Sequence, residues 1–166
     1  MGSDNELRHE LANLLLKRQA HMDFEDAVAN FPPQAINSRP PQCDYSFWHL
    51  LEHMRIAQRD ILDYVYSDDY VWRDFPDGYW PDKTRAVDLS AWQETAEQFL
   101  ADRRQLAAIV LDPATDLFAP LPNSGERKHT IVREIHVIAA HNSYHTGELG
   151  ILRQVMGLWN AGENGQ

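Results

Sequence analysis

The stretch 130–156 constrains the fold of this chain more than any other feature, because it predicts one long helix with two histidines on one face. Thr130 can cap the N-terminus of this helix, and Gly157 can end it in the left-handed conformation. His141 and His145 are four residues apart, which places both imidazoles on the same side of the helix, one turn from each other. In this way one helix can supply two nitrogen ligands to a single metal ion.

The helical period places both histidines in the middle of the predicted apolar stripe. The side chains within about 60° of His141 on a helical projection are Val137, Ile138, His145, Leu152, Val155 and Met156. Glu134 and Glu148 fall on the same line. Because an unpaired polar group in a core is costly, buried histidines and carboxylates need partners. Two interpretations follow: core histidines hydrogen-bonded to the glutamates, or metal ligands supported by carboxylates.

A catalytic metal site of this type needs about three protein ligands and an open position. The predicted helix 44–66 carries two further histidines, His49 and His53. His53 lies at the edge of the apolar face of this helix, whereas His49 lies further round and is expected to be exposed. We therefore predict that His53, His141 and His145 are the metal ligands, with His49 in reserve. The remaining histidines point elsewhere or lack a partner at ligand spacing: His9, His21, His129 and His136.

The chain predicts four long helices and no strand, over about 5–23, 44–66, 90–111 and 130–156. Asp4 is a candidate cap for the first helix, and Ser90 with Gln93 matches a capping box for the third. Closely spaced prolines exclude helix from the connection before residue 44. We expect residues 1–166 to form a single domain, an all-α four-helix bundle with one or more long crossover connections. Bundle cores commonly hold metal sites built from facing helices.

An aromatic-rich connection separates the second and third predicted helices. Its aromatic residues are Tyr70, Trp72, Phe75, Tyr79 and Trp80. A connection of this length is unusual in a compact domain. These side chains therefore either cover part of the bundle or form the wall of a substrate site. The tail 157–166 is expected to be loose, although Trp159 can dock on the bundle.

The charge and cysteine content exclude several classes of function. The formal net charge is −10, which argues against binding to nucleic acid or to an anionic membrane surface. No apolar run is long enough to cross a bilayer, and no signal peptide is visible. Cys43 is the only cysteine, so no intrachain disulfide can form. A reducing, cytoplasmic setting is the simplest expectation.

The chain resembles the DinB-like superfamily, which includes the YfiT-type metal-dependent hydrolases. The resemblance rests on a histidine in the segment WHLLEHMRIA (48–57), and on HNSYH (141–145) followed by GELGILR (147–153). It covers nearly the whole chain in length and helix order. The resemblance implies a four-helix bundle, a divalent metal ion that is usually nickel or zinc, and often a homodimer. Carried over to this chain, the metal ligands would be His53, His141 and His145.

Some members of this superfamily are transferases or isomerases that use low-molecular-weight thiols. A divalent ion held by three histidines can lower the pKa of a bound water or thiol and can polarise a carbonyl. We therefore expect a hydrolase or a thiol-dependent transferase acting on a small-molecule substrate, with no catalytic side chain assigned. Glu134 and Glu148 are expected to orient ligands rather than to act as bases.

The alternative is a non-catalytic metal-binding or stress-related bundle protein. A ferritin-like di-iron centre is disfavoured, because such sites use a Glu-x-x-His motif on two helices. Neither Glu134 nor Glu148 precedes a histidine by three residues.

Overall fold

The structure is a computed structural model that describes residues 2–67 and 69–159. Its four long helices in this part of the chain are α1 (Gly2–Leu16), α3 (Phe47–Tyr66), α4 (Leu89–Leu111) and α5 (Ile131–Val155). Both α1 and α3 pack on α4 and on α5, so the four helices enclose a common core. The described residues contain no strand. The predicted all-α four-helix bundle is confirmed.

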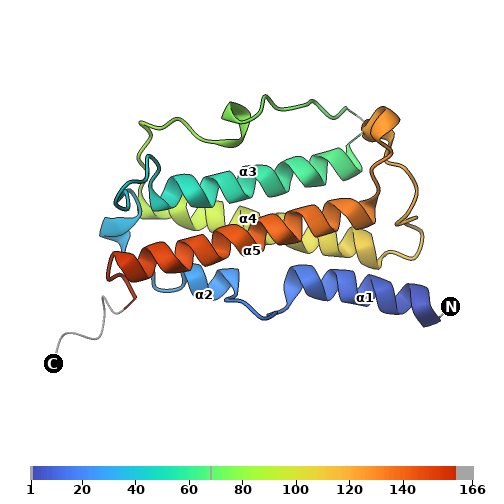
Figure 1. The fold of residues 1–166 in the computed structure, drawn as a ribbon, viewed down its shortest axis with the longest axis horizontal. Coiled ribbons are helices and arrows are strands. Elements are labelled where there is room, and N and C mark those ends of the chain that lie inside the picture. Colours follow the sequence, from blue (N-terminus) through green and yellow to red (C-terminus); the bar gives the residue numbers. More distant parts are fainter. Residues whose placement is uncertain (1, 68, 160–166) are drawn as a thin grey trace.

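The directions of the helices require a long connection between α3 and α4. Figure 1 shows α1 and α5 running one way along the bundle and α3 and α4 running the other way. Because α3 and α4 are parallel, residues 69–88 return along the whole length of α3, and we call this segment the crossover. It contains the 3-10 helix η2 (Asp77–Tyr79). The other connections hold α2 (Phe24–Val28), η1 (Pro33–Ala35) and η3 (Pro122–Arg127).

The ends of α5 are as predicted, and the starts of α3 and α4 differ by a few residues. The Thr130 hydroxyl accepts a hydrogen bond from the Arg133 backbone N–H at 3.3 Å, and Gly157 has a left-handed φ of 66°. Helix α3 begins at Phe47 rather than at residue 44, because Ser46 caps it. Helix α4 begins at Leu89, since the Asp88 carboxylate, and not Ser90, accepts from the backbone at 2.9 Å.

The predicted extent of the first helix is wrong at both ends. Helix α1 begins at Gly2, so that Asp4 lies inside it and pairs with Arg8 at 2.9 Å instead of capping. The helix ends at Leu16 rather than at residue 23. The Gln19 side chain donates to two backbone carbonyls at this end, and Phe24 packs on Phe99 with ring centroids 4.2 Å apart. Burial of Phe24 thus outweighs the local helical preference of the segment.

The predicted buried face of α5 is also wrong. The residues of α5 that are buried are Ile131, Glu134, Ile135, Ile138, Ala139, Thr146, Leu149, Gly150 and Arg153. Their mean direction is about 100° around the helix from His141. Val137 is 41% exposed and Val155 is 63% exposed. Hydrophobicity alone misplaces this face because Thr146, Gly150 and Arg153 are part of it. The histidine pair therefore lies at the edge of the buried face.

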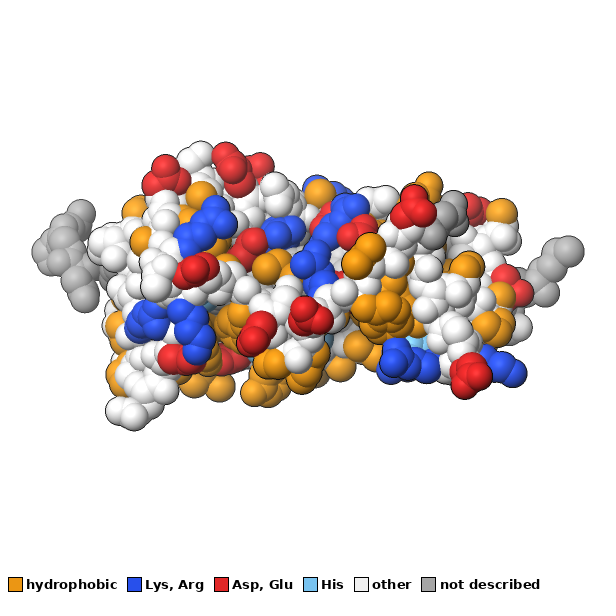
Figure 2. All heavy atoms as spheres, turned by 90° about the horizontal axis from the view of Figure 1, so that it is seen from above, with side chains coloured by type: hydrophobic (Ala, Val, Ile, Leu, Met, Phe, Trp, Pro, Cys, Tyr) orange, Lys and Arg blue, Asp and Glu red, His pale blue; other side chains and the backbone are white. Residues whose placement is uncertain are grey.

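The core of the described chain has an aliphatic part and an aromatic part. The aliphatic cluster joins α1, α4, the end of α3 and the first part of α5, while the aromatic cluster surrounds α2 and the start of α3. Trp159 docks as expected, donating to the Gly150 carbonyl at 3.2 Å, and the rest of the predicted loose tail, 160–166, lies outside the described residues. Among the helices that the structure describes, none combines the length and the apolarity needed to span a bilayer. Figure 2 shows acidic and basic side chains interspersed over the crossover face.

Candidate metal centre

Three imidazoles meet between α3 and α5, namely His53 from α3 and His141 and His145 from α5. The Nε2 atom of His53 lies 3.1 Å from Nε2 of His141 and 3.2 Å from Nε2 of His145. One ligand atom from each of the three residues lies within 4.8 Å of the other two. Two nitrogen ligands of one tetrahedral ion, each about 2.0–2.1 Å from it, are about 3.3 Å apart. The spacing of the three side chains fits a single ion.

The outer nitrogen atoms fix the tautomers of two of these rings. His53 Nδ1 lies 2.8 Å from the Tyr79 carbonyl oxygen, and His145 Nδ1 lies 2.6 Å from a Glu148 carboxylate oxygen. Both partners are acceptors, so Nδ1 carries the proton and Nε2 of the neutral ring carries a lone pair. When both rings are neutral, two lone pairs face each other at 3.2 Å. This arrangement repels unless a cation lies between them, and it fits the donor set of a metal ion.

The pKa of His141 keeps its ring neutral. Burial, and then the neighbouring His145 and His53, lower the pKa of His141 to about 4. Burial also lowers the pKa of His53. A neutral imidazole is the form that binds a metal ion. Nδ1 of His141 is buried and has no hydrogen-bond partner among the described residues, which distinguishes this ring from the other two.

Glu148 holds His145 in place from behind. One oxygen accepts from the His145 ring and the other accepts from the Tyr45 hydroxyl. Burial by itself would raise the pKa of Glu148, but the hydrogen bonds from His145 and Tyr45 outweigh it and lower that pKa. Burial and the Glu148 hydrogen bond raise the pKa of Tyr45, so its hydroxyl remains a donor. With both oxygens engaged, Glu148 is an orienting group rather than a free base.

The sequence-based expectation for Glu134 is wrong. Glu134 is only 2% exposed, but its carboxylate contacts Arg133 at 2.5 Å and His129 at 3.3 Å rather than a histidine of the cluster. The helical projection places Glu134 in phase with His141, yet it lies two turns away along the axis. Phase on a helix therefore does not by itself bring two side chains into contact.

The expectation that His49 is exposed is also wrong, because this residue is only 3% exposed. Its Nδ1 lies 2.5 Å from the Ser46 hydroxyl, and its Nε2 lies 3.0 Å from the Asp82 carbonyl oxygen. Both ring nitrogens are therefore engaged outside the cluster. The available signal was Ser46 three residues earlier, since a polar side chain at the third position of a helix can complete a capping box.

Side chains near the start of α3 and from the crossover line one side of the centre. The Trp80 ring stacks on the His53 ring with centroids 4.0 Å apart and planes 5° apart, and Tyr45 lies 5.3 Å from Trp80. Tyr70 and Trp72 instead pack on Tyr64, further along α3. The aromatic connection thus covers part of the bundle with some residues and walls the histidine cluster with others.

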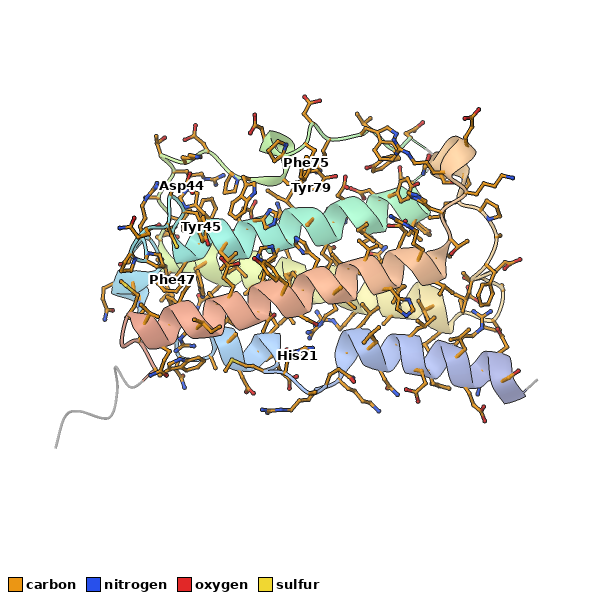
Figure 3. The ribbon with its side chains drawn as sticks, in the orientation of Figure 1. His21, Asp44, Tyr45, Phe47, Phe75 and Tyr79 are labelled. Atoms are coloured by element: carbon orange, nitrogen blue, oxygen red, sulfur yellow. The ribbon has the colours of Figure 1, made fainter. Side chains whose placement is uncertain are left out.

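A cavity of about 310 Å³ adjoins this wall. It is lined by Asp44, Tyr45, His49, Pro76, Asp77, Trp80, Pro81 and Lys83. Tyr45 and Trp80 are shared between the cavity and the surroundings of the three imidazoles. Figure 3 shows Asp44 and Tyr45 near the start of α3, and Tyr79 between the crossover and α3. The volume is within the usual range for small-molecule sites.

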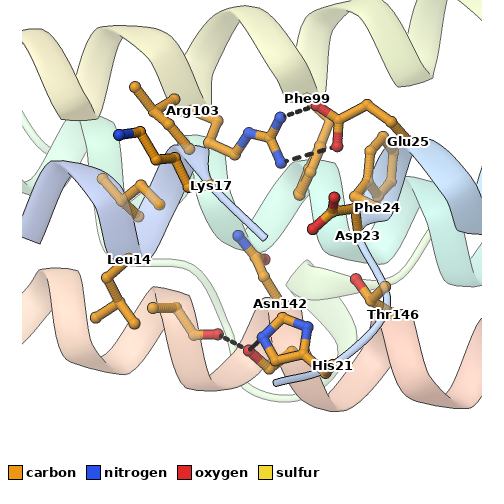
Figure 4. A pocket seen from close by; sticks show the side chains of 14 residues that line it. Leu14, Lys17, His21, Asp23, Phe24, Glu25, Phe99, Arg103, Asn142 and Thr146 are labelled. Carbon is orange, nitrogen blue, oxygen red and sulfur yellow. Dashed lines mark hydrogen bonds and ion pairs between the residues drawn. The ribbon is translucent and has the colours of Figure 1, made fainter. Parts of the chain in front are cut away.

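A second cavity, of about 80 Å³, lies among the end of α1, the start of α2, α4 and α5. The charge of Arg103 is paired there with Glu25, and His21 contacts the Ser143 hydroxyl at 2.9 Å (Figure 4). Asn142 lines this cavity, whereas none of the three clustered histidines does. A space of this size suits a few water molecules and is too small for most organic substrates.

The fold and the cluster define a four-helix-bundle protein with three imidazoles gathered between two facing helices. A family model described as the DinB superfamily matches residues 17–149, and the chain belongs to this superfamily. The matched range includes His53, His141 and His145. Searches of curated proteins and of solved structures gave no match. The predicted family is confirmed, while the ligation of a metal ion by these residues stays a prediction.

Proposed function

We propose that the protein is a metal-dependent enzyme in which His53, His141 and His145 hold one divalent ion. The observation that carries this proposal is the convergence of three Nε2 atoms, since that of His53 lies 3.2 Å from that of His145 and 3.1 Å from that of His141. Nitrogen ligands suit nickel and zinc, the two ions that we propose. Three protein ligands leave coordination positions free for a substrate.

When bound, such an ion lowers the pKa of a coordinated water or thiol and polarises a carbonyl. The reaction that we propose is hydrolysis of a small molecule, or transfer of a low-molecular-weight thiol to an electrophile. The residues of the chain supply orientation: Glu148 directs His145, and Tyr79 directs His53. Trp80 and Tyr45 cover one side of the cluster, and the substrate site that we propose is the adjoining cavity, which these two residues also line. A cytoplasmic location, which we also propose, would keep such thiols reduced.

A comparison of wild type with His141→Ala tests the activity. Both proteins are loaded with zinc or nickel and screened for thiol transfer and for ester and amide hydrolysis. We expect turnover by the wild type and a rate at least about 100-fold lower in His141→Ala. Removing a metal ligand should reduce activity more than removing a residue that hydrogen-bonds to a ligand. Stoichiometric metal binding without turnover in either assay would instead support a non-catalytic metal-binding bundle. Equal turnover by both proteins would contradict the proposed centre.

We further propose that the protein forms a homodimer through the exposed apolar side chains of α5. Val137, Tyr144, Ile151 and Val155 are 41%, 69%, 65% and 63% exposed. Their spacings of seven, seven and four residues place them on one side of the helix. Sedimentation of wild type and of Ile151→Glu tests this assembly. A dimer that the substitution dissociates supports it, and a monomeric wild type at high concentration contradicts it.

A further inference from the structure

The orientation of His53 depends on the crossover rather than on the bundle helices. Its Nδ1–H donates to the Tyr79 carbonyl at 2.8 Å, 26 residues further along the chain, and its ring face stacks on Trp80. Both contacts come from two consecutive residues of the crossover. The direction of the His53 lone pair is therefore set by where the chain holds Tyr79 and Trp80.

Asp60 fastens the crossover on one side of these two residues. It lies seven residues after His53 on α3, which is two turns along the same face of the helix, and it is only 6% exposed. Its carboxylate accepts from the Tyr79 hydroxyl at 2.7 Å and from the Tyr70 hydroxyl at 3.1 Å, and it pairs with Arg73 at 3.4 Å. A buried carboxylate needs such donors, and here the crossover supplies all three.

His49 fastens the crossover on the other side. Its Nε2–H donates to the carbonyl of Asp82, three residues after Tyr79, at 3.0 Å. The opposite nitrogen then carries a lone pair, which faces the Ser46 hydroxyl at 2.5 Å. This double engagement explains why a histidine outside the cluster is almost fully buried.

We propose that Asp60 and His49 are positioning residues of the metal centre. They act through Tyr79 and Trp80, which fix the tautomer and the ring plane of His53 and leave its Nε2 directed at the other two imidazoles. Asp60 binds the Tyr79 side chain while the Tyr79 backbone binds His53, so one residue joins the two groups. This inference rests on the proposed metal-binding function for its effect on the ion.

Two tyrosines that donate to the same carboxylate provide a matched test. Tyr79→Phe and Tyr70→Phe each remove one hydroxyl bonded to Asp60, but only Tyr79 contacts His53 through its backbone. We expect Tyr79→Phe to weaken Co²⁺ and Zn²⁺ binding about tenfold, the lower end of the range for outer partners of metal ligands. It should also shift the visible absorption of the Co²⁺ protein. Tyr70→Phe should change the affinity less than about twofold.

A second readout on the metal-free protein separates this inference from the proposed function. In the wild type, the Nδ1–H of His53 should give a slowly exchanging proton resonance, which Tyr70→Phe retains and Tyr79→Phe loses. His49→Gln serves as the second variant if Tyr79→Phe does not fold, and it should likewise speed this exchange. Equal effects of the two tyrosine substitutions, or none from Tyr79→Phe, overturn the inference. A wild-type protein that binds no metal overturns the proposed function. In that case the exchange rate of the His53 Nδ1 proton still tests whether Asp60 and His49 position this ring.

Discussion

The two sides of the histidine cluster are held in different ways. On the α5 side, His141, His145 and Glu148 lie within eight residues, and the pitch of one helix places them. On the α3 side, His53 is oriented by residues 26 and 27 positions later in the crossover. The first side is specified by local sequence and the second by tertiary structure. The contacts that orient a ligand on the first side can be predicted from spacing, and those on the second side cannot.

Removing a ligand on the local side should have the largest effect. We expect His145→Ala to weaken zinc binding by more than about 100-fold, because only two of the three proposed imidazole ligands remain. Removing a ligand should cost more affinity than removing a residue that merely hydrogen-bonds to a ligand. Competition with a chromogenic chelator measures the affinity. His136→Ala is the control on the same helix, since His136 is exposed and its Nδ1 contacts the Val132 carbonyl rather than the cluster. Equal losses in both variants would show that the binding site lies elsewhere.

His49 and His53, one turn apart on α3, allow the same test on the α3 side of the cluster. His53→Ala should reduce zinc binding as strongly as His145→Ala, whereas His49→Ala should keep one equivalent of zinc with an affinity within about tenfold of wild type. Its main effect should be a loss of about 1–2 kcal/mol of unfolding free energy, since it removes the His49 half of the capping box and the buried hydrogen bond to Asp82. Urea denaturation and zinc titration measure the two quantities. A His49→Ala protein without zinc would contradict the assignment of His53.

Substitution of Glu148, which hydrogen-bonds to His145 on the α5 side, should have an intermediate effect on metal affinity. Glu148→Gln removes the charge that orients His145, and such outer partners contribute about 10–100-fold in metal affinity. Glu134→Gln is the matched control, because Glu134 is on the same helix and buried but contacts His129 and Arg133. It should lower stability and leave the affinity unchanged. Zinc titration of both variants measures the contrast, and a larger loss in Glu134→Gln would contradict it.

The sequence predicted what depends on spacing and missed what depends on packing. The helix over α5, its Thr130 cap, the end of α4 at Leu111 and the family all followed from local pattern. The buried face of α5 did not, because Arg153 and Gly150 are buried there and hydrophobicity does not mark them as core. The role of Asp60 could not be recognised either, since its partners come from the crossover. Ser46 marked the capping box of His49 but not the contact of this residue with the Asp82 carbonyl. The convergence of His53 on the pair was expected from its place on α3, whereas the roles of Tyr79 and Trp80 were not.

The smallest effect that we expect is a pH dependence of the metal-free protein. The pKa of His141 is lowered in the folded state, so the unfolded chain takes up a proton first as the pH falls below about 6.5. The contribution of the neutral His141 ring to the free energy of unfolding is therefore present above that pH, and it is lost progressively as the pH falls to about 4. Between pH 6.5 and 5.5 we expect a loss of about 1 kcal/mol, somewhat below the value for one fully shifted group.

Urea denaturation in the presence of a chelator measures this loss at the two pH values. His141→Gln, which removes the titrating ring, should show a smaller decline than the wild type. An identical decline in both proteins would assign the pH dependence to other groups.

An anomalous-scattering map from a crystal soaked in zinc or nickel tests the central claim most directly. We predict one strong peak between α3 and α5, which for zinc lies about 2.0–2.1 Å from the Nε2 atoms of His53, His141 and His145. A map with no peak among these three rings, or with peaks only at surface carboxylates, would contradict it.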